Sequence, residues 1–496
     1  MAEQEPTTVL DGAVAYSALT SRDPRFDGVF FVGVTSTNVY CRPICPARTP
    51  KQKNCRFFAT AEAAEKESFR PCLRCRPELA PGNAPVDDAH RIAQLLAHRI
   101  EEGLADDGAG LEDIASQFEL SSRQLRRIVQ KELGVSPIEL MQTRRLLLAK
   151  QLLTETQLPI TEIAFASGFS SLRRFNDAFG SRYRMPPSKL RKQAAGSEEE
   201  ISATDTSTLQ LIYRSPYDWD SVLQFLKART IKEVEWVTDD AYYRTVRIGR
   251  HKGWIAVRHV PQKRALTVEF THSLTPILPA LLGRLRNLFD LNARPDLIAA
   301  HLRQDKMLRK DVGKNPGLRV PGAFDGFELA IRAILGQQIT VKAATTLACR
   351  FAEACGEKIA TPFPQLTRLS PLPEVIAKAN VDGIAKLGII SARARSIIAL
   401  AQAFASGELQ LEAGANPQAA IKQLVTLPGI GPWTAHYIAM RALRWPDAFP
   451  QGDIAVLNNL GGVTAKQAEA MSQAWRPWRS YAVLHIWSKP ARASSR

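Results

Sequence analysis

The stretch LPGIGPWTA, at residues 427–435, is the part of the sequence that most directly decides the fold. Gly429 and Gly431 permit a tight turn whose backbone N–H groups point outward, toward an anion. Thr434 then opens a second helix. We therefore expect two helices joined by a short hairpin that can hold a negatively charged group.

An aspartate follows this hairpin at a defined distance. Asp453, in FPQGD at residues 449–453, lies 20 residues after Trp433 (453 − 433). The hairpin with this spacing resembles the helix-hairpin-helix (HhH-GPD) base-excision DNA glycosylases. Asp453 also stands directly before IAV at 454–456, so it is equally a candidate helix N-cap. The two roles are compatible.

A narrower resemblance covers residues from about 208 to 489. PYDW at 216–219, RVPG at 319–322, AILGQQ at 333–338 and WRPWRSYA at 475–482 resemble the AlkA-type 3-methyladenine DNA glycosylase II. The resemblance implies a catalytic Asp453, and DNA contacts from the hairpin residues Gly429, Gly431 and Thr434. It further implies the following parts: a base pocket of Trp433, Tyr437 and Trp487, a base-displacing wedge at Gln338, and a monovalent cation on the carbonyls of Val425, Leu427 and Ile430.

These residue types suit the chemistry of an alkylated base. An N-alkylated purine is cationic and leaves readily, so an aromatic pocket and one carboxylate are sufficient. Bifunctional relatives carry a lysine where this sequence has Trp433, so a Schiff base is not expected there. The plain alternative for Trp433 and Trp487 is burial in the core.

Four cysteines near the N-terminus have metal-ligand spacing. CRPIC at 41–45 and CLRC at 72–75 form a C-x3-C and a C-x2-C pair separated by 26 residues. This pattern predicts one tetrahedral zinc site on Cys41, Cys45, Cys72 and Cys75. Most such sites are purely structural, and that alternative stays open. Cys55, Cys349 and Cys355 lie outside the pattern and are expected to be packing residues.

FVGVTSTNVYCRPICPAR at 31–48 and FRPCLRC at 69–75 closely resemble the N-terminal domain of the Ada adaptive-response regulator. The resemblance implies that Cys41 accepts a methyl group from a methylphosphotriester in DNA and that the other three cysteines are its zinc co-ligands. Zinc keeps the sulfur ionised at neutral pH. Methylation would change the charge of a zinc tetrathiolate from −2 to −1 and so reduce its repulsion from DNA phosphates.

A helical block follows, with a repeated pattern. One face of a first predicted helix contains Leu111, Ile114, Ala115 and Phe118. One face of the next predicted helix contains Leu125, Ile128 and Val129. The pattern returns with Ile160, Ile163 and Ala164, followed by Leu172, Phe175 and Phe179, and Ala164 lies 49 residues after Ala115 (164 − 115). Ser122 and Ser171 are the expected N-caps, and residues 137–153 form a long connecting helix.

Two such units joined by a long helix resemble the AraC-type DNA-binding domain. Its terminal signature corresponds here to residues 179–191, with Arg184 in place of the usual glycine. Residues 121–192 contain 14 Lys+Arg and 5 Asp+Glu, a balance of +9 (14 − 5), which suits phosphate contact. The candidate base-reading residues are Arg123, Gln124, Arg127, Arg173, Arg174 and Asn176.

The whole chain of 496 residues is too long for one core and carries a net charge of +16, which favours polyanionic partners. We expect a multidomain α+β protein: a small zinc α/β domain (1–79), an all-α double helix-turn-helix domain (86–192), a linker (193–207), an antiparallel β-sheet subdomain (208–275) and an all-α helix-hairpin-helix glycosylase domain (276–496). PGNAP at 81–85 is a further linker candidate.

Two functional hypotheses follow. The first is an alkylation-response protein that senses methylphosphotriesters, activates transcription with RNA polymerase as partner, and excises alkylated bases from double-stranded DNA. The alternative is a transcription regulator with a structural zinc site and a non-catalytic glycosylase-like domain. The absence of a long apolar run and the acidic start MAEQE predict a cytoplasmic protein without membrane contact. Neither Cys349 nor Cys355 lies in a motif for O6-alkylguanine transfer, so that activity is not expected.

Overall fold

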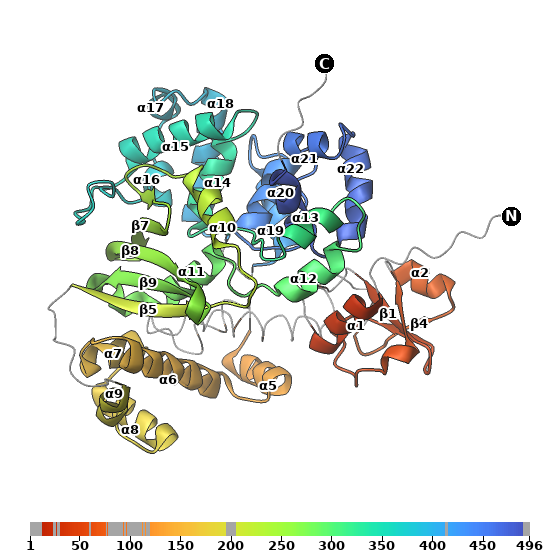
Figure 1. The fold of residues 1–496 in the computed structure, drawn as a ribbon, viewed down its shortest axis with the longest axis horizontal. Coiled ribbons are helices and arrows are strands. Elements are labelled where there is room, and N and C mark those ends of the chain that lie inside the picture. Colours follow the sequence, from red (N-terminus) through yellow and green to blue (C-terminus); the bar gives the residue numbers. More distant parts are fainter. Residues whose placement is uncertain are drawn as a thin grey trace.

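The computed structural model describes residues 12–22, 26, 30–58, 61–75, 77, 93, 96, 112, 115, 120–194, 205–411 and 415–489. Four units follow one another along the chain (Figure 1): a small α/β unit, a helical unit, a five-stranded sheet and a large helical body. This is the expected multidomain α+β class. The linker candidate at 81–85, the middle of the predicted linker 193–207 (residues 195–204), and Leu111, Ile114 and Phe118 lie outside the described residues. The ends of the predicted linker, 193–194 and 206–207, lie in a helix and a strand.

The first unit is built on a four-stranded sheet of order β3-β1-β2-β4. Strand β2 pairs parallel to β4, with Tyr40 opposite Pro71. Cys41 and Cys72 each follow these paired residues, so the parallel pairing places both cysteines at the same end of the sheet. Its elements are β1 (Phe31–Val34), β2 (Val39–Cys41), β3 (Cys55–Phe58), β4 (Arg70–Pro71), α1 (Gly12–Ser21), α2 (Ala61–Lys66) and the 3-10 helix η2 (Gln52–Asn54).

The second unit contains a long central helix and the predicted second helix-turn-helix pair (Ile160–Ala166 and Leu172–Tyr183), and of the first predicted pair the structure describes the second helix, Ser122–Leu133. Leu125 and Val129 are buried in the first pair, and Phe175 and Phe179 in the second. The described helices are α5 (Ser122–Leu133), α6 (Pro137–Glu155), α7 (Ile160–Ala166), α8 (Leu172–Tyr183) and α9 (Pro187–Ala194).

The helix caps of this unit correct one prediction and confirm another. The N-cap of α5 is Ser121, not Ser122, because the Ser121 hydroxyl accepts from the backbone of Gln124, whose side chain accepts in return from the backbone of Ser121. Ser171 caps α8 as expected. Arg184 ends α8 with φ 56°, in the left-handed region where Gly134 ends α5 with φ 76°. The final turn therefore forms although arginine has replaced glycine.

The third unit is an antiparallel sheet of order β5-β9-β8-β7-β6. Short β-branched or aromatic runs at 209–213, 242–248, 254–259 and 265–270 predict four of these strands, all of which are present, and β6 is an addition. The alternating burial along β5 and β9 reflects one face packed on the core. Its elements are β5 (Thr206–Ile212), α10 (Trp219–Lys227), β6 (Glu235–Val237), β7 (Ala241–Ile248), β8 (His251–Val260), the 3-10 helix η4 (Pro261–Lys263), β9 (Ala265–Thr271) and the 3-10 helix η5 (His272–Ile277).

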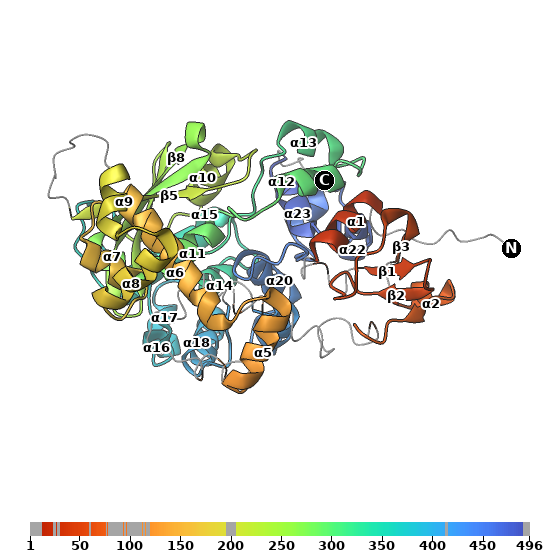
Figure 2. The same ribbon diagram turned by 90° about the horizontal axis from the view of Figure 1, so that it is seen from below.

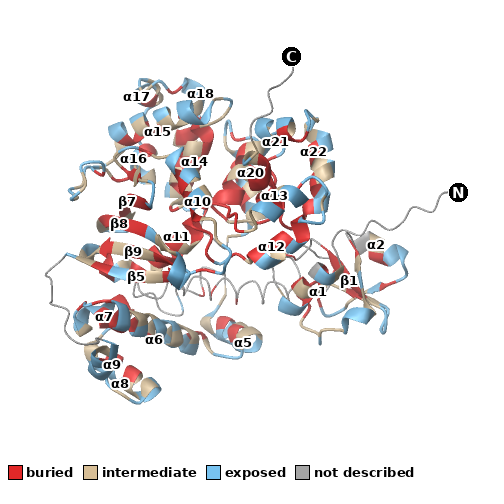
Figure 3. Ribbon diagram, in the orientation of Figure 1, coloured by how far each residue is buried: buried red, intermediate tan, exposed pale blue. Residues whose placement is uncertain are grey.

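The fourth unit is helical, and its buried residues gather along the central helices α14 and α20 (Figure 3). Its elements are α11 (Leu278–Leu288), α12 (Pro295–Leu302), α13 (Arg309–Lys314), α14 (Gly326–Leu335), α15 (Val341–Cys355), α16 (Pro373–Ile376), α17 (Val381–Ala385), α18 (Ser391–Ala405), α19 (Pro417–Thr426), α20 (Pro432–Arg441), α21 (Ile454–Asn459), α22 (Ala465–Ser472), the 3-10 helix η6 (Gln473–Trp475) and α23 (Arg479–Trp487).

Buried ion pairs join the sheet to the helical body. Arg244 of β7 lies 3.0 Å from Glu328 of α14, and Arg332 of α14 lies 3.1 Å from Glu235 of β6. The Tyr242 hydroxyl donates to Glu235 at 2.7 Å. Each carboxylate thus has both a cation and further hydrogen bonds, which buried charges require. The network fixes the sheet relative to α14.

The helix-turn-helix unit packs against the edge of the five-stranded sheet. Gln151 of α6 donates to the carbonyl of Gln210 at 2.9 Å, and the backbone N–H of Gln210 donates to Glu155 of α6 at 2.8 Å. Gln210 lies in the edge strand β5. Figures 1 and 2 both show α6 running alongside this strand. The end of α6 therefore occupies the place of a neighbouring strand at this residue.

The first unit contacts the helical body through aromatic side chains. Phe26 and Trp478 are both buried, and their ring centroids lie 5.3 Å apart in an edge-to-face arrangement. Such pairs add to the stability of simple area burial. Among the described residues, no helix combines the length and apolar character that crossing a membrane would demand.

Candidate zinc and DNA sites

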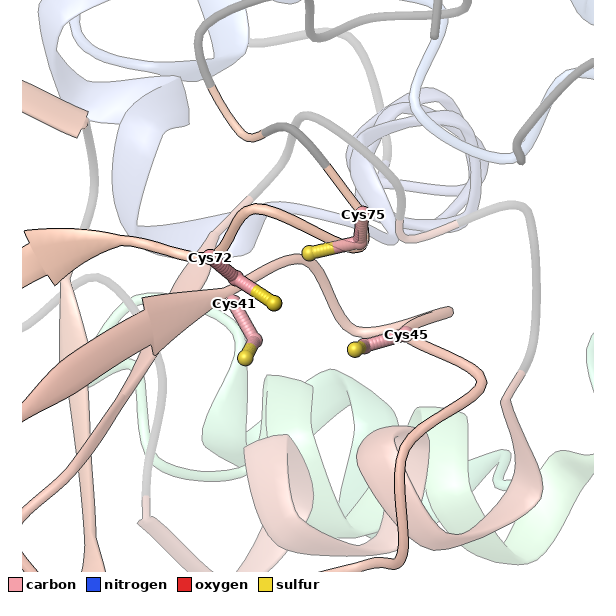
Figure 4. Close-up of side chains that lie close together, drawn as sticks. All are labelled: Cys41, Cys45, Cys72 and Cys75. Carbon is pink, nitrogen blue, oxygen red and sulfur yellow. The ribbon is translucent and has the colours of Figure 1, made fainter. Parts of the chain in front are cut away.

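The four predicted cysteine ligands converge on one point. The sulfurs of Cys41, Cys45, Cys72 and Cys75 all lie within 4.8 Å of one another (Figure 4). Cys41 ends β2, Cys45 follows in a tight turn, and Cys72 and Cys75 follow β4. The backbone N–H of Arg42 donates to the sulfur of Cys75 at 3.4 Å, which orients that sulfur.

Exposure divides the four cysteines into two pairs. Cys45 and Cys75 are buried, whereas Cys41 and Cys72 are only partly buried. As members of the cluster, however, all four cysteines are enclosed, so burial does not select the methyl acceptor. The sequence resemblance implies that it is Cys41, and this role stays a prediction.

Hydrogen bonds among the four cysteine side chains shift the pKa values of their thiols in opposite directions. Hydrogen bonds from Cys41 and Cys75 lower the pKa of Cys45 to about 3. The hydrogen bond with Cys45 raises the pKa of Cys41. An all-sulfur donor set at this spacing is one that Zn²⁺ favours. The cluster fits one tetrathiolate Zn²⁺.

Of the remaining cysteines, Cys55 and Cys355 pack as predicted, whereas Cys349 is held by the backbone N–H of Lys232, which donates to its sulfur at 3.3 Å. The thiol of Cys55 donates to the carbonyl of Lys51 at 3.4 Å. Cys55 and Cys355 both pack against the hydrophobic core. Burial raises the pKa of each thiol, which disfavours the reactive thiolate.

Both recognition helices present the predicted candidates to solvent. On α5 these exposed residues are Arg123, Gln124 and Arg127, and on α8 they are Arg173, Arg174 and Asn176. Gln124 has a second role that the sequence analysis did not assign, because its side-chain oxygen accepts from the backbone and hydroxyl of Ser121, each at 2.9 Å. Only its amide N–H groups remain to meet a base. The other five candidate contacts stay predictions.

The hairpin between α19 and α20 is exposed and depends on one glycine rather than two. Gly429 has φ 75°, whereas Gly431 has φ −87° and caps α20 in an extended conformation. Only Gly429 is therefore required by the backbone of the turn. Thr434 is buried to 2% exposure, and its hydroxyl accepts from Gln337 at 2.9 Å. A contact between Thr434 and DNA would have to use its main chain.

The Asp453 carboxylate accepts three hydrogen bonds. The indole N–H of Trp433 donates to one oxygen at 3.2 Å, and that of Trp487 to the other at 3.0 Å. The backbone N–H of Val456 also donates to Asp453, at 2.9 Å, so Asp453 is the N-cap of α21. Asp453 is therefore a helix N-cap, as expected, and its carboxylate is held between two tryptophans; its catalytic role stays a prediction.

The three predicted pocket aromatics surround this carboxylate. The rings of Trp433 and Tyr437 are stacked, with centroids 5.5 Å apart and an interplanar angle of 12°. The centroids of Tyr437 and Trp487 are 6.3 Å apart. All three side chains are half-buried rather than enclosed. Stacked rings with one accessible side suit a flat, cationic guest.

Arg441 is a residue of this site that sequence reasoning missed. It donates to the Tyr437 hydroxyl at 2.9 Å and to the carbonyls of Pro321 and Gly322 at 2.6 and 2.8 Å. Burial raises the pKa of Tyr437, but the charges of Arg441 and Arg229 outweigh it and bring the pKa to about 8. The i,i+4 spacing of Tyr437 and Arg441 on a helix was the available signal.

Two further predictions concern the wedge residue Gln338 and the cation site in the hairpin. Gln338 is exposed in the loop between α14 and α15, with φ 56° in the left-handed region. The carbonyl of Leu427 accepts from the N–H of Ile430 at 3.2 Å, and Val425 is exposed. The wedge and the cation at Val425, Leu427 and Ile430 both stay predictions.

Comparison with known families assigns each described unit. Residues 14–78 match the metal binding domain of Ada. Residues 114–193 match a helix-turn-helix domain. Residues 208–325 match the AlkA N-terminal domain, and residues 331–480 match the HhH-GPD superfamily base excision DNA repair protein.

Similar proteins extend this assignment along the chain. The sequence is 39% identical over 481 residues to the "Probable bifunctional transcriptional activator/DNA repair enzyme AlkA" of Mycobacterium tuberculosis, covering 95% of each chain. It is 35% identical over 277 residues to "DNA-3-methyladenine glycosylase 2" of Escherichia coli, covering 56% of this chain and 95% of that one. It is 31% identical over 177 residues to the "Bifunctional transcriptional activator/DNA repair enzyme Ada" of E. coli, covering 35% and 48%.

Proposed function

Since the chain belongs to the family of bifunctional transcriptional activator/DNA repair enzymes AlkA, we propose that it joins two activities on alkylated DNA. Its C-terminal half is a monofunctional DNA-3-methyladenine glycosylase. Its N-terminal half transfers a methyl group from a methylphosphotriester to Cys41 and then activates transcription. The observation that carries the proposal is the Asp453 carboxylate, held by the N–H groups of Trp433 and Trp487 beside stacked aromatic rings.

The glycosylase step follows from the properties of this pocket. An alkylated purine that has left the helical stack lies against Trp433, Tyr437 and Trp487, whose ring faces stabilise its positive charge. The bond between C1′ of the sugar and the base nitrogen breaks, and its electron pair goes to the base, which leaves neutral. The positive charge then lies on the sugar, where Asp453 stabilises it. Water adds to C1′ and loses a proton.

The methyl transfer is a displacement at carbon. The Cys41 sulfur attacks the methyl carbon, a carbon–sulfur bond forms, and the bond from that carbon to the phosphate oxygen breaks. The electron pair stays on the oxygen, so the product is an ordinary phosphodiester anion. Cys45, Cys72 and Cys75 hold the zinc with Cys41, and zinc supplies an ionised sulfur at neutral pH.

The regulatory role rests on charge. Methylation of one thiolate reduces the negative charge of the zinc site by one, which weakens its repulsion from DNA phosphates. Double-stranded promoter DNA is then read by α5 and α8 through Arg123, Gln124, Arg127, Arg173, Arg174 and Asn176. RNA polymerase is the partner that a promoter-bound activator needs. A cytoplasmic location is part of the proposal, because a reducing compartment would keep the four thiolates available to zinc.

Several finer assignments belong to the same proposal. Domains span 1–79, 86–192, 208–275 and 276–496, with 193–207 as a linker. The amides around Gly429 and Gly431 hold a DNA phosphate, assisted by a monovalent cation on nearby carbonyls. Gln338 fills the space that the displaced base leaves.

Release of free base from methylated DNA tests the catalytic proposal. Full-length protein is incubated with duplex containing 7-methylguanine, and the expected products are free 7-methylguanine and an intact strand that breaks only after alkali. Borohydride should trap no covalent adduct, because Trp433 offers no amine. If no base is released, the alternative of a regulator with a non-catalytic glycosylase-like domain is correct. A trapped adduct would show that the enzyme is not monofunctional.

A further inference from the structure

The loop that carries Gln338 is tied to the DNA hairpin by its neighbour Gln337. The side-chain amide of Gln337 donates to the carbonyl of Gly429 at 2.8 Å and to the hydroxyl of Thr434 at 2.9 Å. An amide nitrogen has two N–H groups, so both donors of Gln337 are engaged. One acceptor lies in the hairpin turn and the other in the first turn of α20. Gln337 therefore bridges two segments about 90 residues apart in sequence.

Helix α18 supports the same two segments from behind. Arg393 of α18 donates to the backbone carbonyl of Gln337. Ser396, one turn further along α18, lies so close to Gly429 that a Cβ at that position would collide with the Ser396 hydroxyl. The loop and the hairpin thus rest on one helix as well as on each other.

The backbone after Gln337 is set in a less favourable conformation. Gln338 has φ 56°, which a residue other than glycine adopts only when its surroundings hold it there. Its side chain is exposed, next to the hairpin that faces solvent. The strained residue and the clamped residue are adjacent, so the clamp determines where the Gln338 side chain points.

We propose that Gln337 is a positioning residue that locks the Gln338 loop to the phosphate-binding hairpin, so that gripping the DNA backbone and displacing the damaged base act as one step. This inference rests on the proposed glycosylase function and on the wedge role of Gln338. Gln337 itself does not touch DNA or the base. Phosphate binding at the hairpin fixes the strand, and the clamp fixes the wedge against that strand. Energy from the phosphate contact then opposes the restacking of the base.

The substitution Gln337→Glu tests this idea with almost no change in shape. A carboxylate cannot donate to the Gly429 carbonyl, so the bond to the hairpin turn is lost while the side-chain volume is kept; the Thr434 hydroxyl can still donate to the carboxylate. The matched control is Gln402→Glu, an exposed glutamine on α18 whose amide lies 3.5 Å from the carbonyl of Ala377. Gln337→Met, which keeps the length and removes both donors, is the second variant if the glutamate variant does not fold.

The readout compares two substrates in full-length, zinc-loaded protein. One duplex carries 7-methylguanine paired with cytosine, and the other carries it opposite an abasic analogue, where little energy is needed to unstack it. We expect the single-turnover rate of Gln337→Glu to fall at least about tenfold on the paired substrate and less than about threefold on the unpaired one, with Gln402→Glu unchanged on both.

The outcomes separate the inference from the function on which it rests. An equal loss on both substrates would show that Gln337 supports the pocket rather than displacement, and no loss on either would show that the clamp is dispensable. Either result overturns the inference while wild-type activity leaves the proposed function intact. If the wild type releases no base from either substrate, the proposed function itself fails.

Discussion

Replacing Asp453 by asparagine separates the charge of this residue from its shape. In the native structure one carboxylate oxygen accepts from Val456 and from Trp487, at 2.9 and 3.0 Å, and the other accepts from Trp433 at 3.2 Å. The asparagine oxygen can keep the first two bonds. Its amide nitrogen then meets the N–H of Trp433, which places two donors face to face.

The expected loss of rate can be worked out from Coulomb's law. A unit positive charge about 4 Å from the carboxylate gains about 4 kcal/mol at an effective dielectric of ~20. Asp453 is only half-buried, so water screens part of this energy, and about 3 kcal/mol is a reasonable remainder. Since each ~1.4 kcal/mol is a factor of ten, the rate should fall roughly 10²- to 10³-fold.

Stability should change much less than rate. Asparagine is as good an N-cap as aspartate, so α21 keeps its first turn. The lost charge-assisted bond from Trp433 costs about 2 kcal/mol at most. Duplex binding should stay within about threefold of wild type, because the hairpin that holds phosphate does not involve Asp453.

The assay is single-turnover release of 7-methylguanine, with duplex affinity and thermal unfolding measured on the same preparations. The expected pattern is a large loss of rate with small changes in affinity and melting temperature. Release by Asp453→Asn at close to the wild-type rate would refute the catalytic assignment. A parallel loss of duplex binding would show instead that Asp453 holds the DNA interface together.

Three further predictions concern the switch and the pocket. Cys41→Ser should abolish methyl uptake from methylphosphotriester DNA while Cys55→Ser retains it, as peptide mass spectrometry can show; a methyl group on another ligand would identify a different acceptor. The gain in promoter affinity after methylation should shrink between ~0.01 M and ~0.1 M salt, where the Debye length falls from about 30 to about 10 Å; a gain independent of salt would exclude the charge mechanism. The folded pKa of Tyr437, about 8, lies below the ~10 of an unfolded tyrosine. Urea unfolding should therefore show wild type gaining stability over Tyr437→Phe as the pH rises from about 8 to about 10, and losing that advantage as the pH falls through 8; parallel curves would contradict it.

Local patterns in the sequence predicted most of the elements correctly. The repeat of apolar positions predicted the second helix-turn-helix pair and the described helix of the first pair, and short β-branched or aromatic runs predicted four strands of the five-stranded sheet. The error at Ser122 has a local cause, because adjacent serines are equivalent by type and only the hydrogen bonds of Ser121 with Gln124 decide between them. Strand β6 was missed because three residues carry too little periodicity.

The sequence predicted some features of the two sites and not others. Cysteine spacing was sufficient for the zinc ligands, because a metal fixes donor type and number independently of the rest of the fold. Family resemblance predicted which aromatic residues form the pocket. It did not predict the hydrogen bonds from the indole N–H groups to Asp453, because these bonds depend on the rotamers of Trp433 and Trp487, which lie 20 and 34 residues from Asp453 in the sequence. The hydrogen bonds of Gln337 and Arg393 could not be predicted from the sequence for the same reason, because they join residues far apart in the chain.

The contact between α6 and the edge strand β5 bears on whether the two halves of the chain can exist apart. An edge strand with unsatisfied main-chain groups is a template for pairing with another copy of itself. Here Gln151 and Glu155, which belong to the regulator, satisfy Gln210, which belongs to the repair enzyme. Cutting the chain between them would uncover that backbone and invite self-association. The two halves are therefore joined by packing as well as by the chain: the repair half on its own would expose the edge of β5 at Gln210 and would tend to self-associate there.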